Sequence, residues 1–211
     1  MIVTKIKQIG RTNRYHVYVD EQWSGIFMDV TLATYKIKTG GEFDEGEFAR
    51  IKEENDARVS FDMATSYMEK YVTSEKGIKD YLKKKGFDEK IISKAVEKLK
   101  EYGFVDDEKF AKNYFESLSS GKGKRAIATK LLQKGISKEI VENLLENVDE
   151  EQQFETAKKL AEKFVKNRAQ SANLRQKCLA HLIYKGYDYS VAQKATQDAL
   201  ASFGEDVEDW D

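Results

Sequence analysis

One short phrase occurs three times in this sequence: a leucine is followed within four residues by a glycine, an apolar residue and an Asp or Ser. The copies run from Leu82 to Asp88, from Leu132 to Ser137 and from Leu182 to Asp188, and their glycines lie about 50 residues apart. A glycine can take the left-handed conformation that ends a helix, and Asp or Ser can cap the helix that follows. The phrase therefore predicts a tight turn between two helices, used three times.

Apolar residues with helical spacing lie both before and after each of these turns. Each repeat is therefore expected to contain three helices. A unit of about 45 residues buries too little apolar surface to be stable alone. Neighbouring repeats are expected to share contacts and to form an elongated, curved array.

The first residues have the alternation of β-strands instead. Residues 15–19 are rich in β-branched and aromatic side chains, and residues 23–28 are expected to form the second arm of a hairpin after a turn at 20–22. Gly25 predicts either a bulge in that arm or a close approach of another backbone segment. The segment 43–58 is acidic and is expected to be a helical, solvated linker. The predicted fold class is mainly α, with tandem three-helix repeats and a small N-terminal β-hairpin and helix extension.

These patterns divide the chain into five expected parts. They are an N-terminal extension with an acidic linker at 1–58, three-helix repeats at 59–105, 106–149 and 150–203, and an acidic tail at 204–211. The tail has two open interpretations: it is disordered, or it folds onto the basic segments and competes with DNA.

The formal net charge of −1 conceals a separation of charge along the chain. Residues 121–138 contain several cations and no acidic residue, and residues 156–190 are also strongly basic. These blocks are either ordinary solvated helix faces or a surface for an anionic partner. The stretch 121–125 lacks the spacing of a phosphate-binding loop, but it is expected to present cations and exposed backbone N–H groups to phosphate oxygens.

The sequence offers little for catalysis or for binding a metal. His16 and His181 lie too far apart in the chain to suggest a nucleophilic triad, and Cys178 with His181 gives only two metal ligands. No apolar run is long enough to cross a bilayer, and Met1 leads into a strand pattern rather than a signal peptide. We therefore expect a cytoplasmic protein that is not an enzyme and has no metal or cofactor.

With the repeats in view, the chain resembles the RecX family of bacterial recombination regulators. The resemblance covers the phrase from Tyr102 to Ala111, the signature from Leu132 to Ile136 and the stretch from Ser74 to Leu82. The N-terminal strand region is similar to the extension found in the low-GC Gram-positive branch. The matching residues that we interpret as architectural are Asp106, Asp107, Phe110, Ala111, Leu132, Gly135 and Ile136.

The resemblance implies a regulator of the RecA recombinase. Members of the family bind the RecA–single-strand DNA filament and limit ATP hydrolysis and strand exchange, which places them in recombination, DNA repair and the SOS response. The implied partners are this filament and single-stranded DNA, contacted through phosphates without sequence specificity, and no membrane. Charged outer faces on the terminal repeats favour a monomer.

The residues expected to contact the partner are cations of the second and third repeats. They are Lys122, Lys124, Arg125, Lys130 and Lys134 in the second repeat, and Lys158, Lys159, Lys163, Arg168, Arg175 and Lys177 in the third. Two other functions stay open. A stand-alone helix-turn-helix DNA-binding protein would use similar three-helix units, although its base-reading residues would gather on one helix. A scaffold that binds only protein would have no appreciable DNA affinity.

Overall fold

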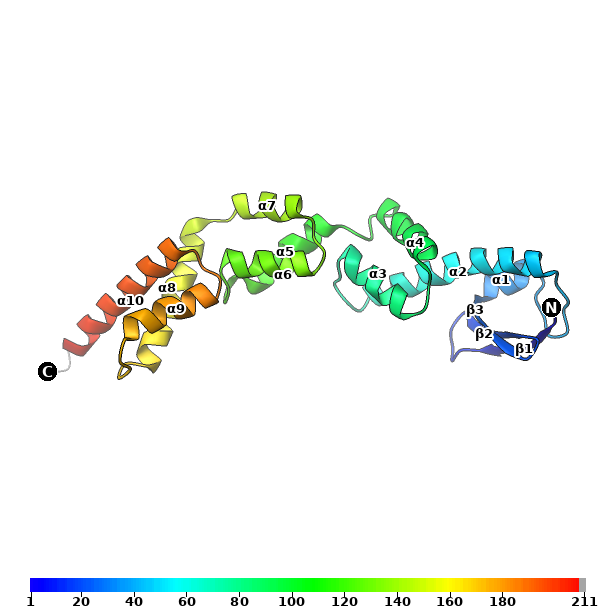
Figure 1. The fold of residues 1–211 in the computed structure, drawn as a ribbon, viewed down its shortest axis with the longest axis horizontal. Helices are drawn as coiled ribbons and strands as arrows, with labels where there is room; N and C mark the ends of the chain where they lie inside the picture. Colours follow the sequence, from blue (N-terminus) through cyan, green and yellow to red (C-terminus); the bar gives the residue numbers. More distant parts are fainter. Residues whose placement is uncertain (209–211) are drawn as a thin grey trace. The chain divides into compact units, whose positions relative to one another are not determined.

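The structure is a computed structural model that describes the backbone of residues 1–208 and the side chains of residues 1–203. It divides into two compact units, Met1–Asp106 (unit 1) and Asp107–Asp211 (unit 2). Figure 1 shows the order of the elements, with a small sheet near the N-terminus and helices in both units. The predicted fold class is confirmed: the chain is mainly α-helical and contains tandem three-helix repeats after a small β-containing extension.

Three antiparallel strands form the sheet in the order β1 (Val3–Gln8), β2 (Arg14–Val19) and β3 (Gln22–Met28). Asp20 and Glu21 connect the last two strands with φ values of 48° and 66°, as in tight hairpin turns. The register shifts between Val17, which pairs with Gly25, and Tyr18, which pairs with Trp23, so that Ser24 is the extra residue. The predicted hairpin is confirmed, with a bulge next to Gly25. The short helix α1 (Asp29–Thr34) follows the sheet directly.

Helix α2 (Glu45–Met68) serves both the sheet and the first repeat. Its first half contributes the buried residues Phe48 and Ile51 to the core beneath the sheet, and its second half contributes Val59 and Met63 to the core of repeat 1. The segment 43–58 is mostly helical, as expected. The expected solvation holds for most of this segment, whose other residues are exposed or half-buried. Phe48, Ile51 and Asn55 are instead buried, because they recur at helical spacing and face the sheet.

Repeat 1 combines α2 with α3 (Glu75–Lys84) and α4 (Glu89–Glu101). Asp88 caps α4 by accepting a hydrogen bond from the N–H of Ile91 at 2.9 Å. The core gathers the apolar faces of the three helices, with Ile78, Leu82, Ile92 and Leu99 fully buried. The predicted turn is confirmed, since a capped helix follows a glycine of positive φ.

Repeat 2 consists of α5 (Asp107–Ser119), α6 (Lys124–Gln133) and α7 (Lys138–Glu146). Its turn follows the same pattern: Gly135 has a φ of 85°, and Ser137 accepts a hydrogen bond from the N–H of Ile140 at 3.3 Å. Phe110 and Ile127 are among the buried residues of its core.

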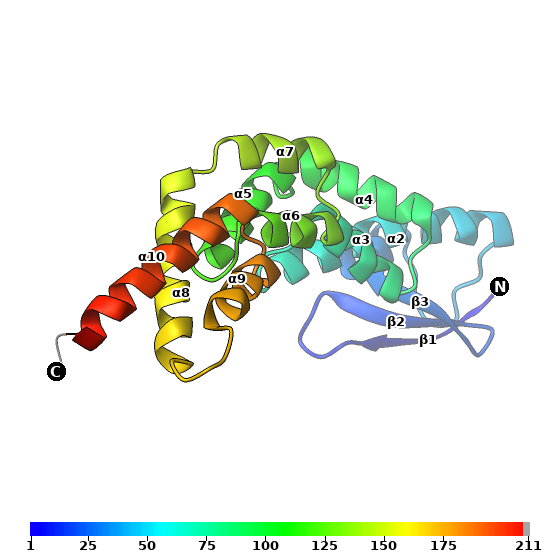
Figure 2. The same ribbon diagram turned by 60° about the vertical axis from the view of Figure 1, so that its left-hand side comes forward.

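Repeat 3 consists of α8 (Glu150–Asn167), α9 (Leu174–Tyr184) and α10 (Tyr189–Glu208). Helices α8 and α10 lie against each other (Figure 2). Their shared core contains Ala157, Ala161, Ala195 and Ala199, whose small side chains allow two helices to approach closely. The predicted tail at 204–211 begins inside α10, and its last residues, 209–211, lie outside the described residues. Both interpretations of the tail therefore stay predictions.

Candidate partner-binding surface

The turn of repeat 3 is hydrogen-bonded to the start of α6 in repeat 2. The N–H of Gly123 donates to the carbonyl oxygen of Lys185 at 3.0 Å, and the N–H of Arg125 donates to that of Gly186 at 3.1 Å. These residues are 62 and 61 positions apart in the printed sequence, so the contact joins two different repeats. The basic stretch before α6 is thus part of an inter-repeat junction within unit 2.

Two glycines make this close contact possible. A Cβ added to Gly123 would lie 2.3 Å from the carbonyl carbon of Gly186, and a Cβ added to Gly186 would lie 2.4 Å from the Cβ of Ala126. Carbon atoms do not approach so closely without displacing their neighbours. Any larger residue at either glycine would therefore force the turn away from α6.

The first amides of α6 already have acceptors. In addition to the bonds from Gly123 and Arg125, the N–H of Lys124 donates to Oε1 of Gln153 at 3.1 Å. Anion binding at a helix N-terminus depends on amides without a protein acceptor. The expectation that this stretch offers exposed N–H groups to phosphate oxygens is therefore wrong at these three positions.

Asp188 binds two of the predicted cations. Its Oδ2 lies 3.0 Å from Nζ of Lys124, and its Oδ1 accepts a hydrogen bond from Nε of Arg125. Lys124 also lies 3.5 Å from Oε1 of Glu150 at the start of α8. These contacts anchor α6 to repeat 3, so Lys124 and Arg125 present less free charge to a partner than the sequence indicates.

The electrostatics of this group favour its charged form. Burial opposes ionisation of Asp188, but hydrogen bonds from Lys124 and Arg125 together hold the pKa of its carboxyl below the ordinary value. The hydrogen bond to Asp188 raises the pKa of Lys124 in turn. The junction therefore contains a stable ion-pair cluster at neutral pH.

Lysines of α8 line a separate hollow in repeat 3. Lys159, Lys163 and Lys166 are spaced at helical intervals on one face of α8, and together with Phe203 of α10 they border a space of about 550 Å³. Glu162 also lines this space. The structure thus gathers two predicted contacts, Lys159 and Lys163, and adds Lys166 to them. We call Lys159, Lys163 and Lys166 the α8 lysine face.

Arg168 and His181 belong to a different contact in repeat 3. The guanidinium of Arg168 lies 4.6 Å from the ring centre of Phe164, and that ring stacks on His181 with 4.7 Å between centres. Burial, with further contributions from Lys185 and Arg168, lowers the pKa of His181. Arg168 is thus partly used in packing.

The other predicted cations are distributed over several helices. Nζ of Lys177 donates a hydrogen bond to Oγ of Ser171 at 2.7 Å. Arg175 and Lys134 are exposed. The predicted contacts that are half-buried are Lys122, Lys130 and Lys158.

The architectural residues lie in or beside repeat 2. Helix α5 begins at Asp107, directly after Asp106, and acidic residues in its first turn complement the helix dipole. The buried members of this set are Phe110, Ala111 and Ile136, and Gly135 forms the turn, whereas Leu132 is half exposed. Asp106 and Asp107 are interpreted as holding the join between repeats 1 and 2, and this role stays a prediction.

Sequence reasoning missed the pairing of Asp188 and a cluster of tyrosines in repeat 1. The sequence predicts Asp188 only as a helix cap, because its position in the repeated phrase matches Asp88. Its ion pairs with α6 depend on a fold contact that no local pattern reveals. Tyr67 stacks on Tyr81 and makes a tilted ring contact with Tyr71, and only the helical interval between Tyr67 and Tyr71 is visible in the sequence.

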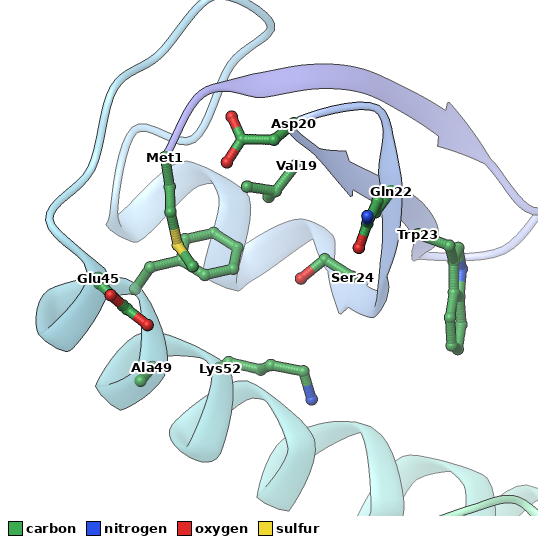
Figure 3. A pocket seen from close by; sticks show the side chains of 10 residues that line it. Met1, Val19, Asp20, Gln22, Trp23, Ser24, Glu45, Ala49 and Lys52 are labelled. Carbon is green, nitrogen blue, oxygen red and sulfur yellow. The ribbon is translucent and has the colours of Figure 1, made fainter.

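A hollow of about 490 Å³ lies between the edge of the sheet and α2 in unit 1. Figure 3 shows Gln22, Trp23 and Ser24 on the strand side and Lys52 on the helix side. Farther along β3 the edge is covered, because Asn55 donates to the carbonyl oxygen of Ile26 at 2.7 Å and accepts from the N–H of Met28 at 3.0 Å.

Within the described residues, no group of three or more His, Cys, Asp or Glu side chains is arranged to hold a metal ion. Among the helices in the described part of the chain, none is both long and apolar enough to span a bilayer.

Tandem three-helix repeats, joined in unit 2 by a backbone junction, define a helical-repeat protein that presents its charged side chains along helix faces. Two family models match this part of the chain: RecX, second three-helix domain, at residues 106–145, and RecX, third three-helix domain, at residues 150–196.

Curated relatives and solved structures agree with these models. Regulatory protein RecX of Listeria monocytogenes serotype 4a is 32% identical over 206 residues, which cover 95% of this chain and 77% of that protein. Regulatory protein RecX of Clostridium perfringens strain 13 is 34% identical over 192 residues, which cover 89% and 91%.

A crystal structure of regulatory protein RecX matches with a TM-score of 0.70 and 26% identity, and it covers 93% of this chain and 98% of the solved one. The crystal structure of RecX from Lactobacillus salivarius matches with a TM-score of 0.65 and 25% identity, over 69% and 97% of the two chains. The chain belongs to the RecX family of regulatory proteins.

Proposed function

We propose that this protein binds the RecA–single-strand DNA filament and limits ATP hydrolysis and strand exchange by the recombinase. The observation that carries the proposal is the α8 lysine face, whose Lys159, Lys163 and Lys166 border one hollow. Clustered ammonium groups suit phosphate oxygens and acidic protein surfaces, and neither contact requires a particular base sequence. Membership of the RecX family supports the regulatory role.

The other predicted cations take different parts in this proposal. Lys124 and Arg125 hold the junction through Asp188, so they contribute chiefly by keeping repeats 2 and 3 together. We retain as contacts the cations outside that cluster, which are Lys122, Lys130, Lys134, Lys158, Arg168, Arg175 and Lys177. We further infer that the protein is a cytoplasmic monomer that catalyses no reaction and needs no cofactor.

The proposal is tested by titrating RecA's single-strand-DNA-dependent ATP hydrolysis with the native protein and with a variant carrying Lys159→Gln, Lys163→Gln and Lys166→Gln. Loss of three phosphate contacts is expected to raise the half-maximal inhibitory concentration by about tenfold or more and to weaken its dependence on salt. The matched control carries Lys7→Gln, Lys36→Gln and Lys38→Gln, which remove the same charge from exposed positions in unit 1.

The outcomes separate the competing functions. Inhibition by the native protein and the control, but not by the α8 variant, supports the proposal. If an excess of native protein leaves ATP hydrolysis by RecA unchanged, the proposal is contradicted. A partner protein bound with no effect of salt or DNA would favour the scaffold, and protection of one DNA sequence in footprinting would favour a helix-turn-helix reader.

A further inference from the structure

Three tyrosines lie ring beside ring on repeat 1, one pair stacked and the other tilted by 39°. Tyr67 in α2 and Tyr81 in α3 are nearly parallel, with ring centres 4.2 Å apart and an angle of 11° between planes. Tyr71, in the segment after α2, lies 4.9 Å from Tyr67. We call Tyr67, Tyr71 and Tyr81 the tyrosine stack.

The outer part of this stack is not needed to fill the core. Tyr81 packs against the core of repeat 1, but Tyr71 is 56% exposed and the adjacent Val72 is 83% exposed. Single exposed apolar residues are common on protein surfaces, whereas contiguous exposed groups usually mark a binding site. A ring held by its neighbours, with much of its surface in water, is pre-arranged to stack on another flat group.

One cation lies over the rings, and others are close to them in the sequence. Nζ of Lys85 lies 5.5 Å from the ring centre of Tyr81. Three more lysines near these tyrosines in the sequence are exposed: Lys70 directly before Tyr71, and Lys83 and Lys84 shortly after Tyr81. Although Glu69 and Asp80 border the same region, residues 81–87 contain three lysines and no acidic residue. The patch therefore offers flat rings for bases and ammonium groups for phosphates.

We propose that the tyrosine stack is a platform for unpaired bases of single-stranded nucleic acid, with Tyr71 taking the base and Lys85 and its neighbours contacting phosphates. Every base has a flat aromatic face, so stacking tolerates any sequence, and bases inside a duplex are not available for it. This inference rests on the proposed function and deepens it, because it places a base contact in repeat 1 beside the phosphate contacts of repeat 3.

The test compares a labelled oligo-dT of about 20 nucleotides with an oligonucleotide of equal length whose central residues are abasic, since both have the same phosphates. The full-length native protein is expected to bind oligo-dT about tenfold more tightly than the abasic strand. Tyr71→Ala is expected to remove this preference, and Tyr71→Phe to keep it. The matched control is Tyr184→Ala, which removes another tyrosine, 87% exposed, from repeat 3 and is expected to keep the preference.

Two results overturn the inference: equal binding of both strands by the native protein, or a preference that survives Tyr71→Ala. A Tyr71→Ala variant that keeps the preference but loses inhibition of RecA would show that the patch contacts protein instead. Inhibition of RecA by the native protein, measured in parallel, tests the proposed function separately. If only the inference is wrong, the native protein still inhibits RecA. If the proposed function is wrong, the native protein does not inhibit RecA at all.

Discussion

The turns of repeats 1 and 3 have nearly the same local structure but different surroundings. Gly86 and Gly186 have φ values of 90° and 92°. A Cβ on Gly86 would meet no described atom within 4 Å, whereas one on Gly186 would lie 2.4 Å from the Cβ of Ala126. The glycine of repeat 1 is therefore needed to end a helix, while that of repeat 3 is also needed because helix α6 of repeat 2 packs directly against it.

The aspartates of the two turns differ in the same way. Asp88 accepts a hydrogen bond from the N–H of Ile91 in its own repeat. Asp188 binds Lys124 and Arg125 from repeat 2. The repeated phrase thus gives the same turn in both repeats. The outer surface of this turn contacts another repeat in repeat 3 but has no such role at Asp88 in repeat 1.

The largest expected effect comes from Gly186→Ala compared with Gly86→Ala. Both changes place a side chain on a residue of positive φ, which costs about 1 kcal/mol, and only Gly186→Ala adds the clash with α6, for a total of about 3 kcal/mol or more. Denaturant unfolding, monitored in each unit by hydrogen exchange, measures the loss in the free energy of unfolding for both variants. Equal losses at the two glycines would contradict the docking role of Gly186.

Gly123→Ala isolates the clash, because Gly123 has an ordinary φ of −75°. We expect a loss of about 2 kcal/mol in the free energy of unfolding of unit 2, together with faster hydrogen exchange at the start of α6. Gly121→Ala is the control, since a Cβ there would have no neighbour within 4 Å in the part of the chain that the structure describes. The interpretation fails if both changes are neutral.

Asp188→Asn should have a smaller effect that depends on pH. We expect a loss of about 1 kcal/mol at pH 7, because the ion pairs with Lys124 and Arg125 are weakened. The pKa of Asp188 is lowered by folding, so its contribution is present above the ordinary value of 3.8 and is lost as the pH falls through the folded value. Native protein and variant should therefore converge in stability in acid.

Asp88→Asn is the matched change in repeat 1. Asparagine caps helices about as well as aspartate, so we expect little loss at any pH. Stability curves from pH 2 to pH 7, measured for both variants, check the pair. A constant difference between native protein and Asp188→Asn across this range would rule out a charge-dependent role for Asp188.

The turns themselves were predictable because their cause is local. Gly86, Gly135 and Gly186 all have positive φ, and Asp88 and Ser137 cap the helices that follow. The docking of one turn on α6 was not predictable, because it depends on residues more than 60 positions apart that meet only in the folded chain. The sequence therefore predicts a partner surface in the basic stretch but does not reveal that part of it also holds the fold.

In the segment 43–58, by contrast, the sequence contains the signal for the packing. The helical spacing of its buried residues is a local pattern, but the many acidic residues point to a solvated segment. Acidic residues dominate 42–56, which favoured a solvated segment. Phe48, Ile51 and Asn55 nevertheless recur at helical spacing, and all three are buried against the sheet. A charged helix can still bury one face when the apolar residues share it.

Helix α2 also determines how unit 1 should unfold. One continuous helix of 24 residues supplies side chains to two cores, so neither the sheet nor repeat 1 can lose its structure without exposing apolar surface in the other. Cooperative units of this kind open together in hydrogen exchange. The strands and repeat 1 should therefore share one unfolding transition. Removal of residues 1–58 should make the unfolding of repeat 1 much less cooperative.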